Sequence, residues 1–158
     1  MSTHSKLGFS EEETKEVVDA LNKLLANYQV HYQKLRNFHW NVEGKDFFEL
    51  HDQFELEYDA VKLQIDEIAE RIRVFGKKPI SSMAGYLNTS EIAEASEETP
   101  SDDMVTEILK DFEILFSFLI DTIEAAGEIG DSATEDMATG YLKRLEQRHW
   151  MFTAWNKG

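Results

Sequence analysis

Apolar residues recur every three or four positions over four long stretches of the chain, and this periodicity predicts four amphipathic helices. The predicted helices span about residues 10–42, 46–76, 99–127 and 132–158. Four N-terminal signals precede them: Ser10 with Glu13, Asp46 with Glu49, Thr99 with Pro100, and Ser132 with Glu135. These pairs have the spacing of helix caps, or place a proline in the first turn.

The periodicity breaks between Gly76 and Pro100, where we expect a long connection. Ser90 is positioned to cap a short helical turn within it. A connection of this length lets the second and third helices run parallel. The sequence therefore predicts an all-α protein, a four-helix bundle with one long crossover containing a short helix. Residues 1–9 are expected to form a short N-terminal tail and residues 10–158 a single bundle domain.

The second predicted helix has two distinct faces. At about 100° per residue from His51, its apolar stripe lies between about 240° and 320°. The stripe consists of Phe47, Leu50, Phe54, Val61, Ile65, Ile68, Ile72 and Phe75. His51, Glu55, Asp66 and Glu70 lie between about 0° and 100°. The stripe should face the bundle interior, so these four polar residues should point away from it.

A histidine with three carboxylates is a ligand set suited to iron, manganese or zinc, although a polar helix face is more often only solvated. Spacing alone leaves both interpretations open. Phe48, Leu56 and Leu63 border the polar residues, which a solvated face would not require.

Geometry adds a constraint on any metal site here. His51 and Asp66 lie about 22 Å apart along one helix, so a single copy cannot bring both to one metal. Two antiparallel copies crossing near residues 58–62 would instead form two equivalent sites across a two-fold interface.

Composition narrows the chemistry further. The chain has 158 residues, a net charge of −15 and no cysteine. The absence of cysteine excludes disulfides, thiolate metal sites and cysteine nucleophiles, and is consistent with the cytoplasm. No long apolar run and no signal peptide are visible, so we expect a soluble protein without membrane association. The charge argues against a generic nucleic-acid surface and favours attraction of cations, although solubility alone would explain it equally well.

The sequence motifs resemble those of the Dps mini-ferritins, the DNA-protecting proteins of starved cells. The shared features are H-W-N-x-x-G, a second histidine twelve residues after the first, and D-x-x-x-E. The resemblance covers nearly the whole chain and implies a ferritin-like bundle. Carried over by position, His39, His51 and Glu55 of one subunit would bind iron with Asp66 and Glu70 of its two-fold partner. Glu55 stands where the family usually has aspartate.

The resemblance also implies an activity and an assembly. The protein would be a ferroxidase in a hollow homo-oligomer of twelve subunits, oxidising Fe²⁺ preferably with hydrogen peroxide and storing ferric mineral. Trp40 would sit beside the iron site and give up an electron or trap a radical. Asp131 and Asp136, with Glu135 third in order, would line acidic pores that admit Fe²⁺. Taken alone, these three acidic residues are equally typical of helix caps and solubility.

Two alternatives remain at this point. An iron site inside one subunit would need two inward E-x-x-H motifs, and the chain has one, Glu146 to His149. A protein that coats DNA directly would usually carry a basic tail, but Lys6 and Lys157 are the only basic charges of the two termini. Direct DNA binding is therefore expected to be weak or absent.

Overall fold

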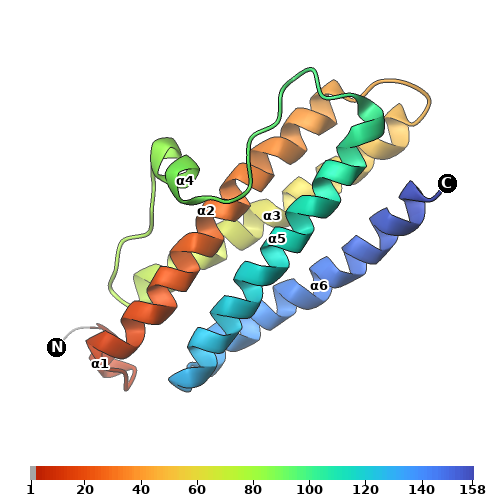
Figure 1. Cartoon of the computed structure of the whole chain (residues 1–158). Helices are drawn as coiled ribbons and strands as arrows, with labels where there is room; N and C mark the ends of the chain where they lie inside the picture. Colours follow the sequence, from red (N-terminus) through yellow and green to blue (C-terminus); the bar gives the residue numbers. More distant parts are fainter. Residues whose placement is uncertain (1–2) are drawn as a thin grey trace.

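Helices are the only regular elements in residues 3–158, the range that the computed structural model describes. They are α1 (Thr3–Lys6), α2 (Glu11–Asn41), α3 (Phe47–Val74), α4 (Met83–Thr89), α5 (Ser101–Glu128) and α6 (Ser132–Asn156). In Figure 1 the four long helices lie side by side, with α2 and α6 running one way and α3 and α5 the other. The predicted all-α four-helix class is confirmed. The segment expected to be a plain tail contains α1.

Two helical hairpins make up the bundle. Helix α2 packs on α3, α5 packs on α6, and α2 joins the hairpins through its contact with α5. The segment from residue 75 to 100 crosses from one hairpin to the other and carries α4, which packs on α2. The crossover therefore lets α3 and α5 run parallel, as expected. No helix within residues 3–158 is long and apolar enough to cross a lipid bilayer.

The helix starts agree with the sequence signals only in part. The box at Ser10 is formed, since Glu13 N donates to Ser10 Oγ over 3.1 Å and Ser10 N to Glu13 Oε2 over 2.8 Å. The box expected at Asp46 is wrong. Asp46 has φ −97° and ψ 12°, and its side chain makes no capping bond, because it does not adopt the extended backbone of a normal N-cap. Helix α5 begins after Pro100, one residue later than expected.

The short crossover helix precedes Ser90, so the expectation that Ser90 opens it is wrong. Ser82 caps α4 by accepting from Gly85 N over 3.1 Å, and Ser90 lies at its C-terminal end. The buried Asn27 of α2 holds the following segment, because its Oδ1 accepts from Ser90 Oγ, Glu91 N and Ile92 N. This amide supplies the acceptor that two backbone N–H groups would otherwise lack.

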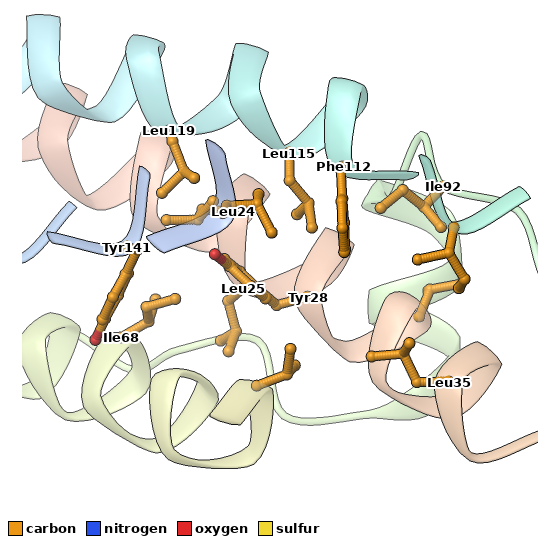
Figure 2. Close-up of a cluster of buried hydrophobic side chains, with 14 of the residues drawn as sticks. Leu24, Leu25, Tyr28, Leu35, Ile68, Ile92, Phe112, Leu115, Leu119 and Tyr141 are labelled. Carbon is orange, nitrogen blue, oxygen red and sulfur yellow. The ribbon is translucent and has the colours of Figure 1, made fainter. Parts of the chain in front are cut away.

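The core lies between the four long helices (Figure 2). Tyr28 from α2, Ile68 from α3, Leu115 from α5 and Tyr141 from α6 converge there, and all four are buried. Six residues of the apolar stripe expected on α3 are fully buried, while Phe47 and Ile65 are partly buried. Each large apolar side chain buried in this way stabilises the fold by about 1.5–3 kcal/mol. The stripe fixes the rotation of α3 and so presents its other face to the outside.

Candidate metal centre

Two histidines meet where the α2–α3 hairpin closes. His39 Nδ1 lies 2.7 Å from the backbone oxygen of His51, and His51 Nδ1 lies 2.7 Å from the backbone oxygen of His39. The imidazole rings stack with their centroids 3.8 Å apart. We call this arrangement the histidine clasp. The carbonyl of His39 belongs to the last turn of α2, where helix carbonyls lack an intrahelical partner.

The histidine clasp fixes the tautomer of both rings. A backbone carbonyl can only accept, so each Nδ1 must carry the proton and donate it. A ring with this tautomer has its lone pair on Nε2, which is the arrangement of metal-binding histidines. Neither Nε2 has a protein partner among the described residues, although His39 is only 6% exposed. The clasp therefore presents two oriented nitrogen ligands.

Glu55 lies one helical turn beyond His51 and is exposed. Tyr58 Oη donates to Glu55 Oε1 over 3.3 Å, and the Tyr58 ring meets the His39 ring edge-on with centroids 5.2 Å apart. Desolvation, and then the charge of Glu55, raise the pKa of Tyr58 above its usual value. The hydroxyl therefore stays protonated and keeps its role as donor. Tyr58 links the carboxylate to the histidine clasp, and the sequence analysis did not identify it.

Asp66 and Glu70 lie on the same exposed face of α3 as Glu55, further toward its C-terminal end. Neither makes a hydrogen bond or ion pair within residues 3–158. In that range no three histidine, aspartate or glutamate side chains come close enough to hold one metal ion. One chain thus brings His39 and His51 into contact, with Glu55 one turn further along α3, and leaves Asp66 and Glu70 apart, as the helix spacing requires.

The bundle interior contains buried carboxylates, but these are already paired with basic side chains of the same chain. Glu57 is fully buried and accepts from the guanidinium groups of Arg144 and Arg148. Asp111 is 2% exposed and accepts from Lys34 Nζ over 2.8 Å.

Neither buried carboxylate is thus available to a metal. His149, from the single E-x-x-H motif, lies 3.9 Å from Glu113 on α5, and Glu146 is exposed. The geometry therefore gives no support to an iron site inside one subunit.

Comparison with known proteins identifies the family of the chain. The family model described as a ferritin-like domain matches residues 18–157. The DNA protection during starvation protein 2 of Bacillus anthracis is 41% identical over 140 residues, which cover 89% of this chain and 96% of that protein. General stress protein 20U of Bacillus subtilis is 37% identical over 142 residues, covering 90% and 98% respectively. The chain belongs to the Dps family of mini-ferritins.

Solved Dps structures share its fold. The Dps protein of Vibrio cholerae O1 superimposes with a TM-score of 0.88 at 40% identity, over 91% of each chain. It is described as a member of a broad superfamily of ferritin-like diiron-carboxylate proteins. The Dps protein of Bacillus brevis superimposes with a TM-score of 0.89 at 37% identity, over 93% of this chain and 99% of that one.

The acidic corner of this Dps chain contains one buried and two more accessible carboxylates. Asp131, and not Ser132 as expected, caps α6, because its Oδ1 accepts from Thr134 N. The same oxygen accepts from Arg71 over 2.8 Å, and the residue is only 2% exposed. Glu135 is partly buried and Asp136 is exposed. Asp131 thus has a structural task within the chain, and Asp136 is the most accessible of the three pore candidates.

Trp40 follows His39 directly but lies apart from the histidine clasp. The indole is 58% exposed, and the Arg36 guanidinium lies over it at 5.2 Å from the ring centroid. Within the described residues no ring contact joins Trp40 to either histidine. Its role at an iron site therefore stays a prediction.

Proposed function

We propose that this Dps chain oxidises Fe²⁺ at two equivalent sites, each shared between two subunits, and stores the ferric product. His39, His51 and Glu55 of one subunit would hold the iron with Asp66 and Glu70 of the partner subunit. The observation that carries the proposal is the histidine clasp. It holds each Nδ1 on a backbone carbonyl and leaves both Nε2 atoms without a partner in the described residues, while the two carboxylates that would complete the ligand set, Asp66 and Glu70, have no partner there either.

Exposed apolar side chains support an interface on this face of α3. Phe48 is 80% exposed, Leu56 48% and Leu63 65%. Side chains of this kind border both the histidine half and the carboxylate half of the ligand set. Burying them against a second copy would remove apolar surface from water, and an isologous contact would bury each of them twice.

The chemistry follows from the ligand types. Carboxylate oxygens and imidazole nitrogens are ligands suited to iron, and the negative carboxylates stabilise Fe³⁺ more than Fe²⁺. Two Fe²⁺ ions each lose one electron, and one hydrogen peroxide molecule accepts both together with two protons, giving two water molecules. Peroxide, as the preferred oxidant, would thus be consumed without release of hydroxyl radical. We propose that Trp40 gives up an electron or traps a radical beside the iron site.

Storage requires an enclosed volume, and we propose a hollow assembly of twelve subunits built from these dimers. The net charge of −15 per chain suits an acidic interior that attracts Fe²⁺. Asp136 is our first choice for the residue at the iron entry pore, because it is exposed at the α5–α6 corner. Glu135 would add negative potential behind it, whereas the Arg71 guanidinium offsets the charge of Asp131.

Direct coating of DNA is the weaker alternative. Within the chain Arg71 binds Asp131 and Lys77 binds Glu11, with N–O distances of 2.8 and 3.0 Å. Arg73 donates to the backbone oxygen of Lys77. Three of the four basic residues at the end of α3 are therefore engaged within the chain, and exposed Lys78 is the fourth. We propose that protection of DNA works through removal of iron and peroxide.

Mixing two inactive variants tests the shared site. His51→Ala and Asp66→Ala should each abolish rapid peroxide-dependent Fe²⁺ oxidation, followed by ferric absorbance in a stopped-flow instrument. In a mixed dimer one site loses both ligands and the other keeps all of them. Co-refolded equimolar variants should therefore recover about a quarter of the parent rate, since half of random dimers are mixed and each has one intact site.

Glu49→Ala is the matched control, because Glu49 is an exposed carboxylate of α3 outside the ligand face. It should keep the parent rate. Full activity of either ligand variant alone, or no recovery in assemblies shown to be mixed, would overturn the shared site.

A further inference from the structure

We propose that Asp59 of each subunit forms an ion pair with Lys62 of the partner subunit, and that these two reciprocal contacts set the register of the dimer. The inference rests on the proposed shared site, because that site defines which residues of the two α3 helices face each other. It concerns two residues that bind no iron.

The register follows from the ligand pairs. In antiparallel copies, His51 must lie level with Glu70 of the partner subunit, and Glu55 level with Asp66 of the partner subunit. Both pairs are centred on the point midway between residues 60 and 61. Asp59 and Lys62 are centred on that same point. Any dimer that assembles the iron ligands therefore also brings each Asp59 level with Lys62 of the partner subunit.

Both side chains point toward the ligand face. Counted from His51, Asp59 lies at about 80° and Lys62 at about 20°, within the sector of about 0° to 100° that His51, Glu55, Asp66 and Glu70 occupy. Both residues are exposed. Neither makes an ion pair in the described part of the chain, although they are three residues apart on one helix. Their charges are thus available to a second copy.

The pair lies close to the two-fold axis. Each residue is one and a half positions from the centre, which is about 2 Å along the helix, whereas His51 is about 14 Å away. Crossing helices diverge with distance from their crossing point, so the central pair meets at any crossing angle.

The acidic surroundings make the Asp59–Lys62 pair important for the register of the dimer. The ligand face is acidic, with Asp52, Glu55, Asp66 and Glu70 on each copy. Without bound iron, two such faces would therefore repel each other. Lys62 is the cation nearest the centre, and it borders a groove with Leu63 and Asp66. Matched opposite charges at the centre offset part of that repulsion, whereas a slipped register would bring carboxylates together.

Charge reversal with mixing tests the pair. In Asp59→Lys homodimers two lysines face each other, and in Lys62→Asp homodimers two aspartates do. In a dimer mixed from the two variants every contact is between opposite charges. We expect mixed dimers to exceed nine-tenths of all dimers after equimolar co-refolding of mass-tagged chains, because a preference of about tenfold or more follows from replacing repulsion by attraction twice. Native mass spectrometry of dimers released by mild denaturant measures this fraction.

Two controls accompany the test. Glu107 and Lys110 have the same three-residue spacing on α5, with a 3.6 Å ion pair at the surface. Glu107→Lys mixed with Lys110→Asp makes the same charge changes away from α3 and should give the statistical half of mixed dimers. The double variant Asp59→Lys with Lys62→Asp should pair with itself as the parent does. The neutral variants Asp59→Asn and Lys62→Gln should give a smaller excess of mixed dimers than the reversed variants, because the mixed dimer keeps one Asp59–Lys62 contact and neither homodimer has any.

Statistical mixing of the two reversed variants would overturn the ion pair. Fe²⁺ oxidation by the parent separates this failure from failure of the shared site. Statistical mixing with an active parent removes only the ion pair. Biased mixing with a parent that oxidises no iron keeps the register and removes the iron site. Statistical mixing with an inactive parent removes both.

Discussion

The buried charge cluster between α2 and α5 allows a quantitative test of the fold. Asp111 accepts from Lys34 Nζ at 2.8 Å and lies 3.1 Å from His31 Nδ1, and all three side chains are nearly inaccessible to water. Asp111→Leu leaves the Lys34 ammonium buried without a counter-charge. Removing one partner of a buried pair costs about 3–5 kcal/mol, whereas replacing both by apolar residues is often neutral.

The double variant Asp111→Leu with Lys34→Met should therefore recover most of the loss. A residual cost of about 1–3 kcal/mol should remain, because His31 Nδ1 has lost its acceptor and is fully buried. Urea unfolding followed by circular dichroism, at one fixed protein concentration, measures both values, since assembly adds to apparent stability.

Glu107→Leu serves as the surface control, because its ion pair with Lys110 is exposed and should contribute less than about 1 kcal/mol. A double variant no more stable than Asp111→Leu alone would refute the reasoning. So would a cost for the single variant as small as that of the control.

Three further predictions concern the site and the surface. Tyr58→Phe should keep the edge-on contact with His39 but lose the hydrogen bond to Glu55, so stopped-flow traces should show a fall in Fe²⁺ oxidation of about 2- to 10-fold with unchanged urea stability. Arg71→Met should cost about 3 kcal/mol in the same unfolding assay, because Asp131 stays buried without its cation; a cost below 1 kcal/mol would show that the cap alone satisfies the carboxylate. Plasmid DNA should not be retarded in a gel at neutral pH and physiological salt with chelator present, because the chain has a net charge of −15 and binding through phosphate contacts needs several clustered basic residues.

The helices could be predicted because their apolar stripes are long and regular. The stripe on α3 fixed in advance which face would be buried, and so which face would carry Glu55, Asp66 and Glu70. Cap positions were less predictable, because Asp131 and Ser132 are both good caps and the choice depends on Arg71, which is remote in sequence. The crossover helix was misplaced for the same kind of reason, since Asn27 of another helix holds Ser90.

The buried charged residues also lie in register with the apolar residues of their helices, a pattern from which their burial could have been predicted. Glu57 lies at about 240° on α3, the edge of the apolar stripe, and Asp111 and His31 fall at the spacing of the apolar residues around them. A polar residue in register with a stripe is a candidate for a buried pair. Its partners could not be named from sequence, because they come from a different helix in each case. The histidine clasp depends likewise on the closure of the α2–α3 hairpin.

The histidine clasp gives the proposed site two halves of unequal stiffness. Each imidazole is held by its neighbour's backbone, so the nitrogen half is set before any metal arrives and loses little entropy on binding. Asp66 and Glu70 are exposed and, within the described residues, have no partners, so the oxygen half keeps its rotamers. Iron becomes smaller when Fe²⁺ is oxidised to Fe³⁺, so its ligands must move toward the ion on oxidation and release it afterwards. Two fixed histidines opposite two mobile carboxylates suit a site that turns over repeatedly and does not retain its iron permanently.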